Sequence, residues 1–197
     1  YNASKAEAES LSKFTVYGDL SDPSSYNDLI SRCEKPIDIL INNASLFTKD
    51  CLQESTSERV LQEFHVNLFA PLDLMRQLAL QTKIGSIINI LDRRIKSYDT
   101  TCVPYSLSKK SLAELTCLAA IEYSPNIQVN AIAPGPILAP PNIDAAVYKE
   151  SAGKILLNNI PTKEEVVDAG CYLLESSSIT GQILYLDSGQ HLLGNGV

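Results

Sequence analysis

The sequence lacks the features that mark several large classes of protein. No apolar run approaches the ~20 residues that a membrane-spanning helix requires, which excludes such a helix. No basic run is longer than the pair Arg93-Arg94, and the net charge is -7, so neither nucleic acid nor an anionic membrane is indicated as a partner. Five scattered cysteines without the paired spacing of metal ligands predict no bound metal and indicate reduced thiols in a cytoplasmic protein.

The chain also shows no internal repeat, low-complexity segment or linker. Its 197 residues, 45% of them hydrophobic, suffice for a single domain over 1–197. Apolar runs predict strands over 14–17, 37–41, 86–91, 127–132 and 182–187. The run over 37–41 suits a strand that is covered on both faces.

Between these runs, apolar residues recur at helical spacing. The predicted helices span 6–13, 26–32, 60–75, 110–123, 145–158 and 166–174. Two capping boxes, Ser55 with Glu58 and Thr162 with Glu165, precede two of these helices. The alternation of strands and helices predicts an α/β fold with a doubly wound parallel sheet.

In such a sheet, ligands bind beyond the carboxyl ends of the strands. The residues at these positions are Asp19, Asn43-Ala44-Ser45, Asp92 and Pro134-Gly135-Pro136. Tyr105 joins them, because it opens the helix that follows the Asp92 loop. We therefore expect the functional site at this edge of the sheet.

Tyr105 and Lys109 are four residues apart, so a helix places both side chains on one face, one turn apart. An ammonium group beside a phenol favours the phenolate, so Lys109 is expected to lower the pKa of Tyr105. A phenol tuned in this way can give or take a proton during a reaction. Such a short pattern also arises by chance in a chain with nine tyrosines, so its weight depends on its surroundings.

Motifs on both sides of Tyr105 and Lys109 resemble those of the short-chain dehydrogenase/reductase family, and the resemblance covers nearly the whole chain. The matching motifs are Asn42-Asn43-Ala44-Ser45, His65-Val66-Asn67, Ile87-Ile88-Asn89-Ile90, Tyr105-x-x-x-Lys109, Asn130-Ala131-Ile132-Ala133-Pro134-Gly135, Ile179-Thr180-Gly181-Gln182 and Leu186-Asp187-Ser188-Gly189. They occur in the family's order and roughly at its spacing. The resemblance implies a Rossmann-like fold and an oxidoreductase that uses a nicotinamide cofactor.

The resemblance also implies roles for the matching residues. The catalytic group would be Tyr105, Lys109, Asp92 and Asn67. Lys109 would hold the nicotinamide ribose, and Asn67 would position a water of the proton relay. The cofactor contacts would be Ser4, Lys5, Asp19, Leu20, Asn43, Ala44, Ser45, Lys109, Pro134 and Gly135, with Asp19-Leu20 at the adenine. The substrate contacts would be Ser45, Phe47, Asp92 and Tyr105.

Two departures from the family pattern stand out. The family opens with a strand and a Gly-rich turn that places the pyrophosphate on a helix N-terminus, and this sequence has neither. We therefore expect a domain truncated at its N-terminus, without its first βαβ portion. The second departure is Asp92, which stands thirteen residues before Tyr105, where the family usually has serine.

Asp92, together with Ser45 in place of glycine, resembles the pteridine reductases and the bacterial dihydromonapterin reductases. A serine hydroxyl suits a carbonyl oxygen, whereas a carboxyl group can relay a proton to a pterin nitrogen or pair with the N–H donors of the ring. The resemblance implies reduction of a pterin or dihydrofolate-type substrate. An ordinary carbonyl or 3-oxoacyl-thioester reductase, and an inactive scaffold or binding relative, remain as alternatives.

The same resemblance implies NADPH as the cofactor and a cytoplasmic homotetramer. Ser4 and Lys5 stand where an acidic residue would select NAD, and both can bind a 2′-phosphate, although Ser4 is also a plausible surface helix cap. Phe47 either stacks on a flat substrate or belongs to the core. We interpret His65 as a packing residue, His191 as structural or at a subunit contact, and Arg93-Arg94 as a solvated loop pair.

Overall fold

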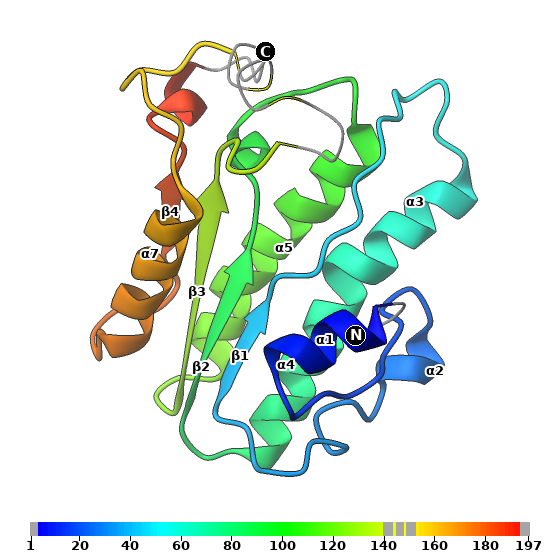
Figure 1. The fold of residues 1–197 in the computed structure, drawn as a ribbon, viewed down its shortest axis with the longest axis vertical. Coiled ribbons are helices and arrows are strands. Elements are labelled where there is room, and N and C mark those ends of the chain that lie inside the picture. The colour runs from blue at the N-terminus through cyan, green and yellow to red at the C-terminus, as the bar shows by residue number, and fades with distance from the viewer. Residues whose placement is uncertain (1–3, 140–143, 145–147, 149–152, 194–197) are drawn as a thin grey trace.

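A computed structural model describes residues 4–139, 144, 148 and 153–193. At its centre lies a parallel sheet of four strands in the order β1-β2-β3-β4 (Figure 1). The strands are β1 (Ile39–Asn42), β2 (Gly85–Ile90), β3 (Ile127–Pro134) and β4 (Ile183–Leu186). Four of the predicted strands are thus confirmed to within a few residues, and so is the α/β fold.

Helices connect the strands and lie on both faces of the sheet (Figure 1). The α-helices are α1 (Lys5–Leu11), α2 (Pro23–Tyr26), α3 (Ser57–Phe64), α4 (Ala70–Gln81), α5 (Val103–Glu122) and α7 (Lys163–Glu175). Three short elements of other types are the π-helix η1 (His65–Phe69) and the 3₁₀ helices η2 (Arg93–Lys96) and η3 (Gln190–Leu193). None of the described helices is long and apolar enough to cross a membrane.

The core divides between the two faces of the sheet. On one face, Ile87 and Val129 pack against Met75 and Leu78 of α4 and against the alanines of α5. On the other face, Ile88 and Ile132 pack against Leu173 of α7. Because successive strand residues point to opposite faces, the central strands must be mostly apolar, and their buried polar residues Asn89 and Asn130 are hydrogen-bonded.

Two strand predictions need correction. Residues 14–17 form no strand, and the exposed fractions of Phe14 and Tyr17 are 47% and 49%. The β propensity of this run is not met by any strand beside it among the described residues. In β1, Ile39 and Ile41 are 47% and 53% exposed, so the expectation of two covered faces is wrong: α7 packs over β2 and β3 on that side and leaves these side chains half open.

Some of the helix and capping predictions are confirmed, and others need correction. The capping box of Thr162 and Glu165 is present at α7, whereas α3 is capped by Thr56, whose hydroxyl accepts the Arg59 N–H, and not by Ser55. The predicted helix over 60–75 is interrupted by the π-helix η1. Half of the predicted helix over 145–158 falls outside the described residues; of the other half, 148 is helical and 153–158 are not. The predicted helix over 26–32 is wrong, because α2 ends at Tyr26 and residues 27–32 form turns.

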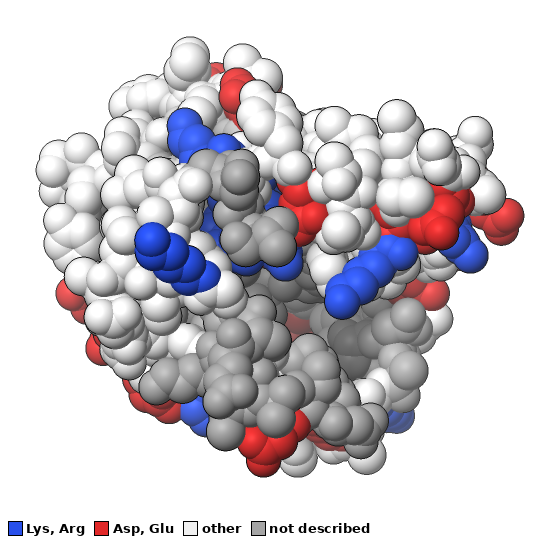
Figure 2. Space-filling model, turned by 90° about the horizontal axis from the view of Figure 1, so that it is seen from above, with Lys and Arg blue, Asp and Glu red and all other residues white. Residues whose placement is uncertain are grey.

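The strands point the same way, so their carboxyl ends meet at one edge of the sheet (Figure 1). Figure 2 looks onto that edge and shows Lys and Arg side chains around its middle, with acidic side chains beside them. This is the face on which the sequence places the functional site.

Candidate active site

The centre of the site is a cluster of Asp92, Arg94 and Tyr105. The Tyr105 hydroxyl donates a hydrogen bond to Asp92 Oδ2 at 3.0 Å. Arg94 also donates to Asp92, from its backbone N–H to Oδ1 at 2.8 Å and from Nη1 to Oδ2 at 3.0 Å. The structure therefore brings together two residues that the sequence predicted, and adds one that it did not.

Local structure places these groups. Asp92 lies just beyond the carboxyl end of β2 and is the N-cap of η2, so its carboxylate is held by the first turn of that helix. Tyr105 lies in the first turn of α5, which begins at Val103 with Pro104 next to it. The phenol is only 6% exposed, so the hydrogen bond to Asp92 lies in a largely dry environment.

The pKa values in this cluster differ from the expectation. Burial, followed by the charge of Asp92 and its hydrogen bond, raises the pKa of Tyr105 far above the usual range. The Lys109 ammonium donates to the Ile90 carbonyl at 2.8 Å and is 2% exposed. Burial lowers the pKa of Lys109 to about 8, although the charges of Asp92 and Glu63 act to raise it. The predicted lowering of the Tyr105 pKa by Lys109 is therefore wrong for this structure, because burial and Asp92 dominate.

Arg94 corrects another interpretation. Arg93 and Arg94 are not a solvated loop pair, since Arg93 is 7% exposed and the Arg94 side chain is 24% exposed. Besides Asp92, Arg94 pairs through Nε with Asp99 at 3.0 Å. Burial lowers the pKa of Arg94, but Asp92 and Asp99 outweigh it and the net pKa is raised. The Arg94 guanidinium thus binds two carboxylates, an arrangement that depends on the conformation of η2 and the loop after it and that the Arg93-Arg94 pair alone does not reveal.

Phe47 and Ser45 come from the segment after β1 and complete this side of the site. The Phe47 ring contacts the Tyr105 ring edge to face, with centroids 4.7 Å apart. The Arg94 guanidinium lies 5.6 Å from the centroid of the Phe47 ring. Phe47 is 44% exposed, which excludes the interpretation of Phe47 as a core residue. Ser45 forms a hydrogen bond that acts to lower the pKa of Tyr105.

Asn67 lies in the π-helix and is completely buried. Its Oδ1 accepts the Leu46 N–H at 2.8 Å and the Ser45 hydroxyl at 3.2 Å. Its Nδ2 donates to the Leu46 carbonyl, to Ser108 and to Glu63, at 2.8, 3.0 and 2.9 Å. A π-helical turn inside a longer helix often marks a functional site, and here it turns the Asn67 amide toward the loop after β1 and toward α5.

The predicted cofactor residues fall into two groups. Asp19, Leu20, Ala44 and Ser45 line one mostly apolar cavity of about 320 Å³, together with Gly18, Leu29, Val66 and Leu74. Asn43 directly follows β1 and is exposed, but it is not among the residues that line this cavity. The structure therefore brings together the residues expected at the adenine end with those of the Asn43-Ala44-Ser45 motif.

The second group shows no contact with that cavity. Lys5 pairs with Glu9 at 3.7 Å on the surface of α1, and the Ser4 side chain makes no capping hydrogen bond. A β-carbon on Gly135 would lie 2.9 Å from Asp187 Cα, so a close chain approach between the ends of β3 and β4 requires glycine there. A cofactor role for Ser4, Lys5, Pro134 and Gly135 stays a prediction.

The remaining candidates have structural partners. The His65 ring packs edge to face on Phe69, and the His191 ring stacks on Tyr185 while its Nδ1 lies 2.8 Å from Asp187 Oδ1. Among the described residues, no three His, Cys, Asp or Glu side chains are grouped so as to hold a metal ion. Glu63, one turn before Asn67, is a further residue of this region that the sequence analysis missed.

Known proteins resemble the chain in sequence. Residues 2–191 match a family model described as enoyl-(acyl carrier protein) reductase. The uncharacterized oxidoreductase YhxC of Bacillus subtilis is 27% identical over 196 residues, which cover 93% of this chain and 68% of that protein. The dihydromonapterin reductase of Citrobacter koseri is 35% identical over 106 residues, 54% of this chain and 44% of that protein. The chain thus aligns with less than half of the length of this reductase.

Solved structures resemble it as well. FolM alternative dihydrofolate reductase 1 from Brucella canis, determined in complex with NADP, superposes with a TM-score of 0.91 and 30% identity. That match covers 98% of this chain and 82% of the Brucella protein. With the family match over most of the chain, the four-stranded parallel sheet and the Tyr105–Lys109 helix, these findings place the chain in the short-chain dehydrogenase/reductase family of oxidoreductases.

Proposed function

We propose that this protein reduces a pterin or dihydrofolate-type substrate with NADPH. The single observation that carries the proposal is the carboxylate of Asp92 in hydrogen-bond contact with Tyr105, where an ordinary carbonyl reductase would present a serine hydroxyl. The dihydromonapterin reductases and the FolM reductase among the relatives support the same substrate class.

The side chains present fit a nicotinamide dinucleotide at two places. The apolar cavity beside Asp19 and Leu20 suits a flat heterocycle such as adenine. Lys109 donates one hydrogen bond, to Ile90, and the other two N–H donors of its ammonium have no partner among the described residues. Such donors suit the hydroxyls of a ribose. NADPH, when bound, supplies the hydride for the substrate carbon.

The residues of the chain supply the proton and the orientation. Reduction of a C=N bond requires a proton on the ring nitrogen, and the Tyr105 hydroxyl is the donor at this site. Asp92 accepts hydrogen bonds from the substrate N–H groups, because its described partners, Arg94 and Tyr105, all donate to it. Phe47 offers an aromatic face or edge to a flat ring. Asn67 and Ser45 hold the loop after β1 against α5.

Steady-state turnover tests the proposal. The protein is assayed with 7,8-dihydropterin, dihydrofolate and an acetoacetyl thioester, each with NADPH and with NADH. We expect kcat/KM to be highest for a dihydropterin or dihydrofolate with NADPH. A higher value for the thioester would identify a 3-oxoacyl-thioester reductase, and no turnover of any of the three would indicate an inactive relative.

A further inference from the structure

Arg94 and Tyr105 direct hydrogen-bond donors at the same atom. The Tyr105 hydroxyl and Arg94 Nη1 each lie 3.0 Å from Asp92 Oδ2. The two donors are therefore no more than two hydrogen-bond lengths apart. The side chains of Asp92 and Arg94 are 16% and 24% exposed, so a ligand can reach this part of the cluster. The reaction proposed above uses the Tyr105 donor and gives the Arg94 donor no role toward the substrate.

The Arg94 guanidinium is held in one orientation. Its Nε donates to Asp99 Oδ2 at 3.0 Å, and the Asp99 side chain is 7% exposed. The other oxygen of Asp99 accepts the Thr101 N–H at 2.9 Å and the Thr101 hydroxyl at 2.6 Å, which fixes this carboxylate in turn. Because Nε and Nη1 bind separate carboxylates, the planar guanidinium cannot rotate without breaking a charged hydrogen bond. The other three of its five N–H groups are available to a ligand.

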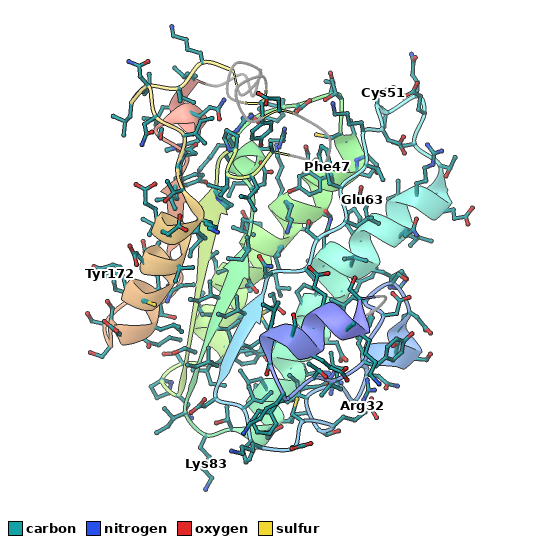
Figure 3. The ribbon with its side chains drawn as sticks, viewed as in Figure 1. Arg32, Phe47, Cys51, Glu63, Lys83 and Tyr172 are labelled. Atoms are coloured by element: carbon teal, nitrogen blue, oxygen red, sulfur yellow. The ribbon has the colours of Figure 1, made fainter. Side chains whose placement is uncertain are left out.

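Phe47 borders the same space. Its ring contacts Tyr105 edge to face, with centroids 4.7 Å apart, and the Arg94 guanidinium lies 5.6 Å from the Phe47 centroid. Figure 3 shows Phe47 beside the start of α5, at the edge where the strands of the sheet end. Phe47 is 44% exposed, so a flat ring can pack on it. Such a ring would turn one edge toward the donors of Tyr105 and Arg94.

Two neighbouring donors suit a ligand edge with two neighbouring acceptors. In a 7,8-dihydropterin, the ring nitrogen N5 receives the proton when the N5=C6 bond is reduced, and the oxygen on C4 lies next to it on the same edge. Both atoms accept hydrogen bonds, and neither carries a proton before the reaction. A simple ketone offers one acceptor oxygen and therefore leaves the second donor without a partner.

We propose that Arg94 is a specificity-determining residue of this site, which donates a hydrogen bond to the C4 oxygen of a pterin while the Tyr105 hydroxyl donates to N5. The inference rests on the proposed function and deepens it, because it names the edge of the ring that the site binds. Arg94 contributes binding and orientation only. The hydride and the proton come from the groups named above, so the reaction itself is unchanged.

The test compares two ligands in three proteins. One ligand is 7,8-dihydropterin, and the other is 2-amino-7,8-dihydropteridine, which lacks the C4 oxygen and the N3 proton that accompanies it. Calorimetry measures the Kd of each in the presence of NADP⁺, which has no hydride to transfer, for wild type, Arg94→Met and Asp99→Asn. We expect Arg94→Met to weaken binding of the dihydropterin about tenfold more than binding of the analogue, the usual value of a hydrogen bond from a charged group.

Asp99→Asn is the matched control, because it disturbs the support of Arg94 and keeps the Arg94 donors. It should change the two Kd values by similar factors. An equal loss for both ligands in Arg94→Met would overturn the proposal, since Arg94 would then only hold Asp92 in place. Should Arg94→Met not fold, NMR of the wild-type protein labelled with ¹⁵N-arginine decides. The guanidinium protons nearest the Phe47 ring should exchange with water more slowly with the dihydropterin than with the analogue, and equal rates would overturn the proposal.

These measurements need no turnover, so they separate this inference from the proposed function. A loss specific to the dihydropterin in Arg94→Met would support the role of Arg94 even in a protein that reduces no dihydropterin, although that protein would refute the proposed function. Turnover of dihydropterin together with equal losses for the two ligands would support the proposed function and remove Arg94 from the recognition of the substrate.

Discussion

Replacement of Asp92 by asparagine changes the centre of the site with almost no change in size. The Asp92 oxygens accept from the Arg94 N–H at 2.8 Å, from Arg94 Nη1 at 3.0 Å and from the Tyr105 hydroxyl at 3.0 Å. Asparagine has one acceptor oxygen and one NH₂ group, so at least one of these donors would face another donor. The substitution also removes the negative charge that Arg94 holds in place.

We expect kcat/KM for the dihydropterin to fall by about 10²-fold or more, the usual value of a positioned acid–base group. That loss corresponds to about 2.7 kcal/mol of transition-state stabilisation. Asp99→Asn is the matched control, because Asp99 also accepts from Arg94 at 3.0 Å, whereas no hydrogen bond among the described residues links it to Tyr105. Both variants should lose stability by roughly 1–3 kcal/mol through a broken charged hydrogen bond, but only Asp92→Asn should lose most of its activity.

The pH profile adds a second readout with a defined sign. The charge of Asp92 acts to raise the pKa of Tyr105 and the pKa of Lys109. The pKa of Lys109 is about 8. Without that charge both values fall, so the alkaline limb of kcat/KM should move to lower pH in Asp92→Asn and stay in place in Asp99→Asn. Steady-state assays from pH 5 to 10, with urea unfolding of each variant, measure both effects. Equal activity losses in the two variants would refute the reasoning, because the effect would then come from the Arg94 loop and not from the contact with Tyr105.

Three further predictions address other residues. Tyr105→Phe should reduce turnover by at least about 10²-fold while the Kd for NADPH, measured by fluorescence titration, changes little, because the phenol is assigned to proton transfer and the ring can still pack on Phe47. Lys5→Ala should weaken NADPH binding by about tenfold and leave NADH binding unchanged if Lys5 meets the 2′-phosphate, and equal effects on the two would remove that assignment. Burial raises the pKa of Asp99, but hydrogen bonds from Thr101 and Arg94 outweigh it and lower the pKa to about 2. The Asp99 carboxylate should therefore contribute about 2 kcal/mol to the free energy of unfolding above pH 4, and this contribution should disappear as the pH falls toward 2. Urea unfolding of wild type and of Asp99→Asn over this pH range measures it.

The framework of the fold follows from patterns that depend on neighbours along the chain. Continuous apolar runs marked the strands of the sheet, and the Thr162–Glu165 capping box marked the start of α7, because the partners of these residues lie within a few positions. The run over 14–17 has the same composition as a strand, yet strand formation needs a second strand beside it, which residue order alone does not supply. The π-helix at Asn67 was equally invisible, since one extra residue in a helical turn leaves the apolar spacing nearly unchanged.

The residues of the candidate active site show the same division between what the sequence predicts and what only the folded chain reveals. Tyr105, Asp92 and Ser45 could be identified because each follows a strand or opens a helix at the ligand-binding edge of the sheet. Arg94 and Glu63 could not, because their importance comes from contacts that only the folded chain forms. Arg94 pairs with Asp92 and Asp99, two and five residues away, through the conformation of η2 and the loop after it, whereas Glu63 accepts the Thr48 N–H from another segment. The raised pKa of Tyr105 was missed for a related reason: the Tyr105–Lys109 spacing predicts a charge effect, but burial is a property of the folded chain and it dominates here.

The hydrogen-bond polarity of the site also bears on the choice of substrate. Asp92 accepts hydrogen bonds from all its described partners, and the Tyr105 hydroxyl donates its one proton in a hydrogen bond to Asp92. A substrate that takes this proton as a hydrogen bond must separate the pair and leave Asp92 one donor short. A carbonyl oxygen offers only an acceptor, so the lost donor would not be replaced and a partly buried carboxylate would be left underbonded, at a cost of about 1–3 kcal/mol. A pterin-type ring presents N–H donors beside an acceptor nitrogen, so it can return a donor to Asp92 while it accepts from Tyr105. On the proposed function, we therefore expect a site of this polarity to favour a nitrogen heterocycle over a carbonyl compound before any proton is transferred.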